Sequence, residues 1–298
     1  MAGQSMRHIK RRINSINSIQ QITRAMEMVA ASKLRRAQQR VNSSRPFTQG
    51  LSQVLAQLVA SEASSYGQRA LGDLHPLLAL REGDKVCYLV VTSDQGLAGG
   101  FNTNITRYVE RKLAENPSSS LAIVGRVGRD YFAHRGVERV GEWVQLGDEP
   151  STTVARVISD RLVSGYLAEE FDEIRLVYTV AKSAISQELV DEQLLPIDVE
   201  KVTASQPEAD WRKEYIYEPS TREIFYHIFP RYVENVIYRA LVESKASELA
   251  ARRTAMRNAS DNAQEMIDEL TISFNRARQA GITTEISEIV GGAEALKG

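Results

Sequence analysis

The sequence predicts an α/β protein in which a central domain with a mainly parallel sheet lies between two long terminal helices. These helices are expected to pair as an antiparallel coiled coil. Apolar residues recur at helical spacing near both ends of the chain, and short β-branched runs alternate with helical stretches in the middle. The apolar content of 43% is typical of a globular protein, and 298 residues suffice for one large domain or two ordinary ones.

The N-terminal segment is predicted to form one long helix. From Ile9 to Val41 the large apolar residues follow one another by three or four positions, the spacing of one helix face. No glycine or proline interrupts the chain between Gly3 and Pro46, and the apolar pattern resumes after Pro46 as far as Val59. Pro46 is therefore expected at a kink or in the first turn of a following segment. A helix with one narrow apolar stripe needs a partner to cover it.

This helix begins as a basic arm. Residues 1–45 carry 10 lysines and arginines and the single acid Glu27, so 10 − 1 gives a charge of +9, whereas the whole chain has −1. Basic arms contact nucleic acid, anionic lipid or acidic protein surfaces, and a solvated helix face is the alternative. The arm has no aromatic residue to stack on bases, so no nucleic-acid partner is predicted.

The C-terminal segment repeats the helical pattern. Apolar residues from Met256 to Ala277 follow each other by three or four positions, close to a heptad seam, and the pattern extends back toward residue 221. Each terminal helix supplies the apolar stripe that the other lacks. We therefore expect an intramolecular coiled coil between residues 4–60 and 215–288. The alternative is a dimeric scaffold, in which each helix pairs with a second copy of the chain.

The middle of the chain has strand-like and helical stretches in alternation. The predicted strands are 86–92, 121–125, 173–181 and 187–197, and the predicted helices lie near 102–115, 128–135 and 151–170. Continuous apolar strands that alternate with helices indicate a mainly parallel sheet with both faces covered. The expected domains are an N-terminal coiled-coil helix at 1–60, a Rossmann-like α/β domain at 76–200, and a C-terminal helix at 211–290.

The motifs of known catalytic sites are missing. Residues 92–105, TSDQGLAGGFNTNI, place a glycine-rich turn after the first strand, but the spacing is neither G-x-G-x-x-G nor that of a P-loop. Phosphate binding and tight-turn packing both remain interpretations of these glycines. The four histidines are scattered, no G-x-S-x-G occurs, and the single cysteine, Cys87, lies in an apolar run. We predict no catalytic, cofactor-binding or metal-binding residue; a nucleotide-using enzyme with helical arms is the alternative.

Four segments of the chain resemble the gamma subunit family of bacterial F-type ATP synthases. They are RRINSINSIQQITRAMEMVAASKLRRAQ at 11–38, SDQGLAGGFN at 93–102, ESKASELAARRTAM at 243–256 and NRARQAGITTEISEIVGGAEAL at 275–296. The resemblance covers essentially the whole chain, and the last segment is the most specific. A start at Met1 without a presequence is expected of a bacterial rather than a mitochondrial member.

The resemblance implies a non-catalytic central stalk. In this family the paired terminal helices turn as a shaft inside a ring of three alpha and three beta subunits. Proton flow through the membrane sector drives the rotation, and ATP is made or hydrolysed at the beta subunits. The other implied partners are the epsilon subunit and the c-ring. The implied location is the cytoplasmic face of the bacterial cell membrane, as a peripheral protein, with roles in ATPase regulation and in assembly of the complex.

The resemblance also assigns contact residues. The expected contacts with beta-subunit loops are Arg278, Gln279, Thr283 and Glu285, and the candidates for facing acidic beta segments are Arg35, Arg36 and Arg252. Tyr215, Tyr217 and Glu218 are expected at the foot, near the c-ring and epsilon. For each shaft residue a solvated helix face is the alternative, and for the foot an ordinary turn.

Overall fold

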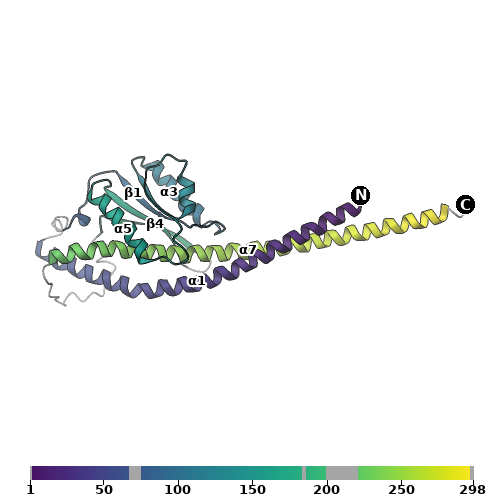
Figure 1. Cartoon of the computed structure of the whole chain (residues 1–298), viewed down its shortest axis with the longest axis horizontal. Helices are drawn as coiled ribbons and strands as arrows, with labels where there is room; N and C mark the ends of the chain where they lie inside the picture. Colours follow the sequence, from purple (N-terminus) through teal and green to yellow (C-terminus); the bar gives the residue numbers. More distant parts are fainter. Residues whose placement is uncertain (1, 67–74, 183–185, 199–220, 296–298) are drawn as a thin grey trace. The chain divides into compact units, whose positions relative to one another are not determined.

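The computed structural model describes residues 2–66, 75–182, 186–198 and 221–295. Figure 1 shows the elements in order along the chain. They are α1 (Ala2–Tyr66), η2 (Pro76–Leu78), β1 (Val86–Val91), α3 (Phe101–Glu115), β2 (Ser120–Val124), α4 (Arg126–Phe132), β3 (Arg139–Trp143), α5 (Thr152–Leu167), β4 (Glu173–Ala181), β5 (Gln187–Leu195) and α7 (Thr221–Ala295).

The chain forms two compact units, and both long helices contribute to each. Met1–Ala30 and Arg252–Gly298 make up the first, which we call the coil unit; Ala31–Ala251 make up the second, the head unit. Helix α1 continues through Pro46 without a break in the helix, and α7 begins at Thr221, as far back as the apolar pattern predicted. The domain division into residues 1–60, 76–200 and 211–290 stays a prediction.

The head unit contains a five-stranded sheet in the order β3-β2-β1-β4-β5. Strand β1 pairs in parallel with β2 and β4, β2 pairs in parallel with β3, and only β5 is antiparallel to its neighbour. The prediction of a mainly parallel sheet is confirmed. It omitted β3, a short edge strand that has no continuous apolar run because the exposed Arg139 and Glu142 interrupt it.

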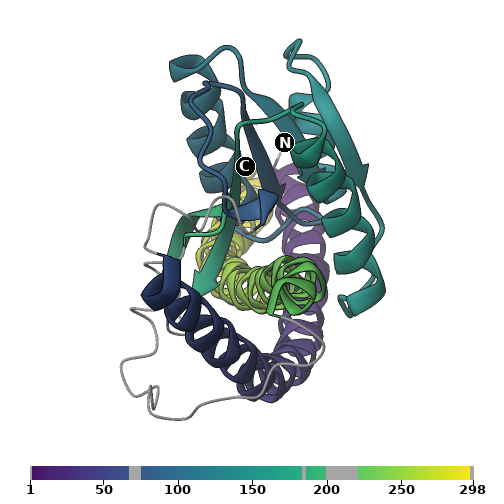
Figure 2. The ribbon, with the colours of Figure 1, turned by 90° about the vertical axis from the view of Figure 1, so that its left-hand side faces the viewer.

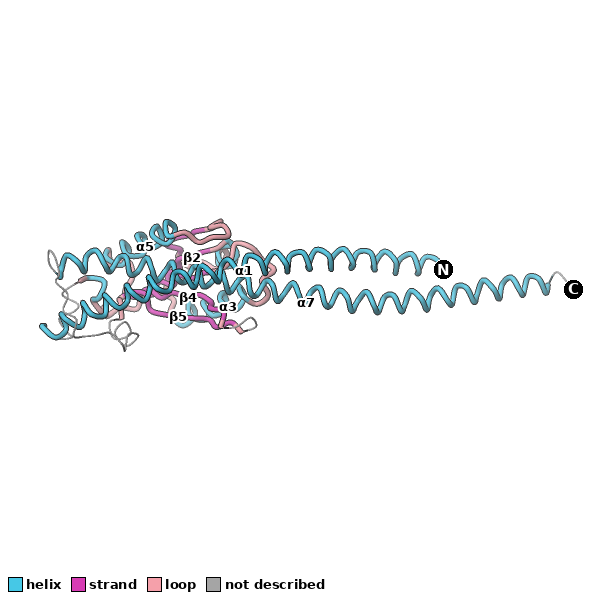
Figure 3. Tube along the Cα trace, turned by 90° about the horizontal axis from the view of Figure 1, so that it is seen from below, coloured by secondary structure: helices cyan, strands magenta, loops and turns pink. Residues whose placement is uncertain are grey.

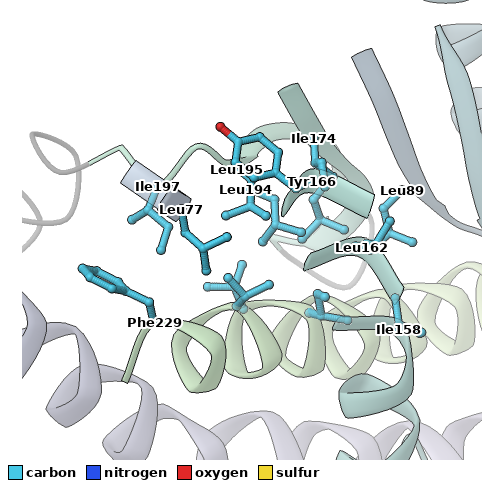
Figure 4. Packing of buried hydrophobic residues seen from close by; sticks show 14 of the residues in the cluster. Leu77, Leu89, Ile158, Leu162, Tyr166, Ile174, Leu194, Leu195, Ile197 and Phe229 are labelled. Carbon is cyan, nitrogen blue, oxygen red and sulfur yellow. The ribbon is translucent and has the colours of Figure 1, made fainter. Parts of the chain in front are cut away.

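The two faces of this sheet carry separate hydrophobic clusters. Successive residues of β1 point to opposite faces, so Cys87, Leu89 and Val91 pack with α5 and α7, whereas Tyr88 and Val90 pack with α3 and α4. Figure 2 shows α3 on one side of the sheet and α5 on the other. In Figure 4 the first cluster joins sheet residues such as Leu89 to residues of α5 and α7.

Within the head unit, α7 is a core helix. Phe225, Phe229, Val233 and Ile237 recur every four residues, and all four are fully buried. The rings of Phe225 and Phe229 stack with their centroids 5.0 Å apart. Because this stripe faces the chain's own sheet and helices, it needs no further partner.

In the coil unit, α1 and α7 run antiparallel. The side-chain amide of Gln20 donates to that of Gln264 over 2.8 Å, and a Cβ added to Gly281 would lie 3.6 Å from the terminal methyl of Met6. Lower positions of α1 thus meet higher positions of α7, as the predicted intramolecular coiled coil requires. Figure 3 shows the two helices side by side, with the last turns of α7 continuing past the N-terminal end of α1.

Candidate functional site

The glycine-rich turn lies at the carboxyl edge of the parallel strands, and its polar groups bond to neighbouring loops. The Asp94 carboxylate accepts backbone N–H bonds from Arg126 (3.0 Å), Gln145 (2.9 Å) and Leu146 (3.0 Å). One side chain thereby joins the loops that follow β1, β2 and β3. The Asn102 amide also binds both the backbone and the hydroxyl of Ser93. Sequence reasoning missed Asp94 because an Asp after a strand is common.

Glycines near this edge allow close packing. Gly125 has a φ of +95°, and a Cβ added there would lie 2.4 Å from the carbonyl oxygen of Thr92. The Thr92 hydroxyl donates to the carbonyl of Val124 (2.8 Å) and accepts from the amide of Gly128 (3.0 Å). These contacts explain Gly125 and Gly128 by tight packing. A Cβ added to Gly96 of the glycine-rich turn would meet nothing within 4 Å, so close packing does not explain that glycine.

The crevice beside this edge is occupied by α7. In open α/β sheets, ligands bind outside the carboxyl ends of the strands, where the strand order reverses. Here Leu241, Ser244 and Lys245 of α7 line that place, together with Thr92 and Asp94, and leave a cavity of about 40 Å³. A space of this size holds a water molecule and no nucleotide. Within the described ranges, no three His, Cys, Asp or Glu side chains are grouped in a way that could hold a metal ion.

The predicted contact residues near the C-terminus lie together on the coil-unit part of α7. Arg278, Gln279, Thr283 and Glu285 are all exposed, and the Thr283 hydroxyl donates to the carbonyl of Gln279 over 3.0 Å. Arg278 and Glu285 are about two turns apart and share one helix face. Their carboxylate, guanidinium and amide groups therefore face outward, available to a partner.

The other predicted contacts are distributed differently. Arg35 and Arg36 are exposed, and they belong to the head unit rather than the coil unit. Arg252 belongs to the coil unit, but only 8% of it is exposed, so it offers a partner little surface. Tyr215, Tyr217 and Glu218 lie outside the described residues.

Large apolar side chains remain exposed along the coil unit. On α1 they include Ile19, Ile22 and Val29, which belong to the apolar helical pattern of this segment. Pairing with α7 leaves this part of the stripe uncovered, because Ile22 is 59% exposed although it has the right spacing. On α7 the exposed apolar residues include Met266, Ile272, Ile282, Ile286, Ile289 and Val290. Several large exposed apolar side chains on one part of a helix are a feature of surfaces that bind a partner.

The basic N-terminal helix and the long C-terminal helix are not membrane spans. No helix among the residues that the structure describes combines the length and the apolar character needed to cross a bilayer.

Comparisons with known proteins agree with this geometry. The family model described as ATP synthase matches residues 5–296. The chain is 48% identical over 293 residues to the ATP synthase gamma chain of Moorella thermoacetica, covering 98% of this chain and 99% of the relative. It is 47% identical over 294 residues to that of Heliobacterium modesticaldum, again covering 98% and 99%.

Solved structures give the same result. A chain of the central stalk and c-ring of the Tetrahymena thermophila mitochondrial ATP synthase matches with a TM-score of 0.57 and 26% identity, covering 80% of this chain and 99% of that one. A chain of the Euglena gracilis mitochondrial ATP synthase matches in fold with a TM-score of 0.67 and 19% identity, covering 99% of this chain and 95% of that one. The full-length matches to curated relatives and to the family model show that this chain belongs to the ATP synthase gamma chain family.

Proposed function

We propose that this chain is the rotor shaft of a bacterial F-type ATP synthase, coupling proton flow through the membrane sector to ATP synthesis and hydrolysis. A gamma chain is a non-catalytic subunit of the central stalk, and catalysis occurs on the beta subunits. The proposed partners are the alpha and beta subunits, the epsilon subunit and the c-ring. The chain would work at the cytoplasmic face of the cell membrane, as a peripheral protein, and would be needed for ATPase regulation and assembly.

The observation that carries this proposal is the exposed apolar surface of the coil unit. Ile282, Ile286 and Ile289 follow one another by three or four positions on α7, and between 48% and 70% of each is exposed. A lone helix with such a stripe is poorly soluble unless another surface encloses it. A ring of alpha and beta subunits around the coil unit would provide that enclosure.

A two-helix coil inside a threefold ring also suits a rotary mechanism. Two different helices cannot present the same surface to three identical beta subunits, so each beta subunit meets a different side of the shaft. When the shaft turns, every beta subunit meets each side in succession. A ligand or partner can shift an equilibrium only by its differential affinity for the two states, and here the asymmetric coil supplies that difference.

We propose that the polar cluster on α7, formed by Arg278, Gln279, Thr283 and Glu285, is a catch, that is, a contact that holds a beta-subunit loop in one rotary state. Arg278 and Gln279 would donate charge-assisted and neutral hydrogen bonds to a beta-subunit loop, and Thr283 and Glu285 would complete the contact. A hydrogen bond to a charged group contributes about 1.5–3 kcal/mol, which shifts a balance between rotary states roughly ten- to a hundredfold. Arg35 and Arg36 would meet acidic beta segments, whereas the proposal for Arg252 depends on the small exposed part of that residue.

The test is ATP hydrolysis and rotation by a complex reconstituted from this chain with alpha, beta and epsilon subunits. We expect Arg278→Ala to slow ATP turnover while assembly and rotation persist, because the apolar shaft surface is intact. Arg276→Ala is the matched control, since this exposed arginine lies two residues away on nearly the opposite side of the helix. Wild-type turnover in the Arg278 variant would exclude a role of Arg278 in this contact. Failure of the wild-type chain to assemble with the other subunits would refute the proposed shaft function.

The foot residues need a separate measurement. Replacing Tyr217 and Glu218 should lower ATP-driven proton pumping in membranes while the ATPase of the detached complex is unchanged. Unchanged pumping would exclude an interface with the c-ring or epsilon at this place.

A further inference from the structure

The loop between β3 and α5 carries two adjacent acids that contact both long helices of the head unit. The Lys33 ammonium donates to the Asp148 carboxylate over 2.7 Å, and the Arg40 guanidinium donates to Glu149 over 2.6 Å. From α7, the Lys245 ammonium lies 3.9 Å from the other oxygen of Asp148. Lys33 and Arg40 are about two turns apart on one face of α1. The loop therefore contacts α1 at two levels and α7 at one.

Both ends of this loop are fixed to the sheet of the head unit and the helices that pack on it. At its start, Asp94 accepts the backbone N–H groups of Gln145 and Leu146, and Gln145 has a φ of +59°, which a non-glycine residue adopts only when held. At its end, the Ser151 hydroxyl accepts from the amide of Val154 and caps α5. The two acids between these anchors are thus positioned by the sheet rather than by the helices they contact.

Near residues 33–40 the contact between α1 and the loop is ionic, whereas near residue 57 the contact of α1 with the core is apolar. Near residue 57, Leu55 and Leu58 are fully buried in the main hydrophobic cluster. Near residue 37, by contrast, α1, the loop and α7 line a cavity of about 50 Å³, and six of its nine lining residues are charged. The hydrophobic cluster of α1 at this level joins Leu34, Ala37 and Val41 to residues of α7.

The charges around Asp148 keep its carboxylate ionised. The hydrogen bond from Lys33 is the first cause that lowers the pKa of Asp148, and the charges of Lys33, Lys245 and Arg36 lower it further. Lys245 is mostly buried and also pairs with Glu248 over 3.0 Å. Asp148 is thus the common anion of cations from α1 and α7.

We propose that residues 144–151 form an electrostatic clasp that fixes α1 against the sheet domain, with Asp148 and Glu149 as positioning residues for torque transfer. The torque role rests on the proposed shaft function. A shaft helix that is held at the level of residues 33–40 only by its packing on α7 could twist there relative to the sheet. The clasp resists that twist. Because both acids are more than half exposed, the ion pairs are individually weak and salt loosens them.

Hydrogen exchange of the isolated full-length chain tests the clasp itself. In the double variant Asp148→Asn with Glu149→Gln, we expect residues 33–41 to exchange about two- to fivefold faster, the range expected for exposed ion pairs. Raising the salt concentration should have the same effect on the wild type and little on the variant. Asp160→Asn is the matched control, because Asp160 pairs with Arg156 within α5 alone. Equal exchange of residues 33–41 in the wild type and the double variant would overturn the clasp.

Charge reversal in the reconstituted complex tests the torque role. Glu149→Arg places a cation beside Arg40, and we expect it to lower the number of protons pumped per ATP hydrolysed at low salt. Adding Arg40→Glu should restore the wild-type ratio, which a merely structural role of one side chain would not do. Normal pumping by the single variant, or no rescue in the double variant, would overturn the proposal. Failure of the shaft function would appear differently, as a wild-type complex that does not pump while exchange in the isolated chain still reports the clasp.

Discussion

The two units of the chain share the same two helices, but they differ in how far the apolar residues of α7 are buried. In the head unit the apolar stripe of α7, which includes Phe229 and Ile237, is fully buried by the chain's own residues. In the coil unit the same helix leaves Ile272 54% exposed and Ile289 70% exposed. Helix α1 differs less sharply: Leu58 is fully buried in the head unit and Ile22 is 59% exposed in the coil unit, but Phe47 in the head unit is 66% exposed. One helix can thus be stabilised by a folded core in one part and require assembly with other subunits in another.

Truncation of one apolar side chain in each unit should give the largest contrast. Phe229→Ala is expected to lower the free energy of unfolding by about 3–5 kcal/mol, because it leaves a cavity in a packed core. Ile272→Ala, at a half-exposed position, should change it by no more than about 0.5 kcal/mol in the isolated chain. Urea denaturation followed by circular dichroism measures both. Equal losses would mean that the coil unit has a core of its own.

Acidification should weaken the head unit through His75. The imidazole is buried, its Nδ1 accepts the amide of Leu77, and its ring contacts Tyr226 and Phe229 of α7. Burial lowers the pKa of His75 from 6.5 to about 4. The unfolded chain therefore takes up the proton first, so stability is complete above pH 6.5 and falls as the pH drops toward 4.

At pH 5 the loss from this histidine should reach about 2 kcal/mol relative to pH 7. Urea denaturation at the two pH values measures it, and His75→Asn, which keeps an acceptor for the amide of Leu77, is the control that should remove this part of the pH dependence. The coil unit has no equivalent buried histidine among its described residues. An unchanged pH dependence in the variant would show that His75 is not responsible.

Loss of the Asp94 charge should have a smaller effect, confined to the head unit. Asp94→Asn keeps one acceptor oxygen but removes the charge that receives three backbone N–H groups, so we expect a loss of about 1–2 kcal/mol. Hydrogen exchange should accelerate in the loops after β2 and β3. Asp130→Asn, an exposed acid paired with the adjacent Arg129, should have no such effect. Faster exchange in the coil unit would show that the effect is not confined to the head unit.

Thiol labelling compares the burial of the two units, with little expected change in the stability of the protein. Cys87 is fully buried in β1, and burial raises the pKa of its thiol to about 12. At pH 8 it should stay protonated and resist thiol reagents until the chain unfolds. A cysteine introduced by Ile272→Cys, with Cys87 present, should react at once. Rapid labelling of native wild-type chain would contradict the packed sheet.

Apolar residues at spacings of three and four were sufficient to predict the long helices, and continuous apolar runs were sufficient to predict the central strands. These patterns missed β3, whose residues Arg139 and Glu142 interrupt any apolar run, since an edge strand is held mainly by backbone pairing to β2. Loop contacts such as those of Asp94 were also missed, because the groups that bind it lie more than thirty residues away in the chain.

The exposed residues of the coil unit show a different limit of sequence reasoning. The spacing of Ile19, Ile22 and Val29 indicates correctly that they are on a helix, but it does not indicate which molecule covers them. For the same reason, the contact residues around Arg278 were predicted from the resemblance to the gamma subunit family and not from the spacing of residues. The sequence of one chain shows which apolar residues share a helix face, but it does not show the partner surface that binds them.

The coil unit is expected to depend on partners for its order, whereas the head unit is not. The most direct measurement is hydrogen exchange of the full chain, alone and assembled with alpha and beta subunits. We predict that residues 225–250 are well protected in both states and that residues 10–30 and 262–290 gain strong protection only on assembly. Equal protection of residues 10–30 and 262–290 in the free chain and in the complex would contradict the account.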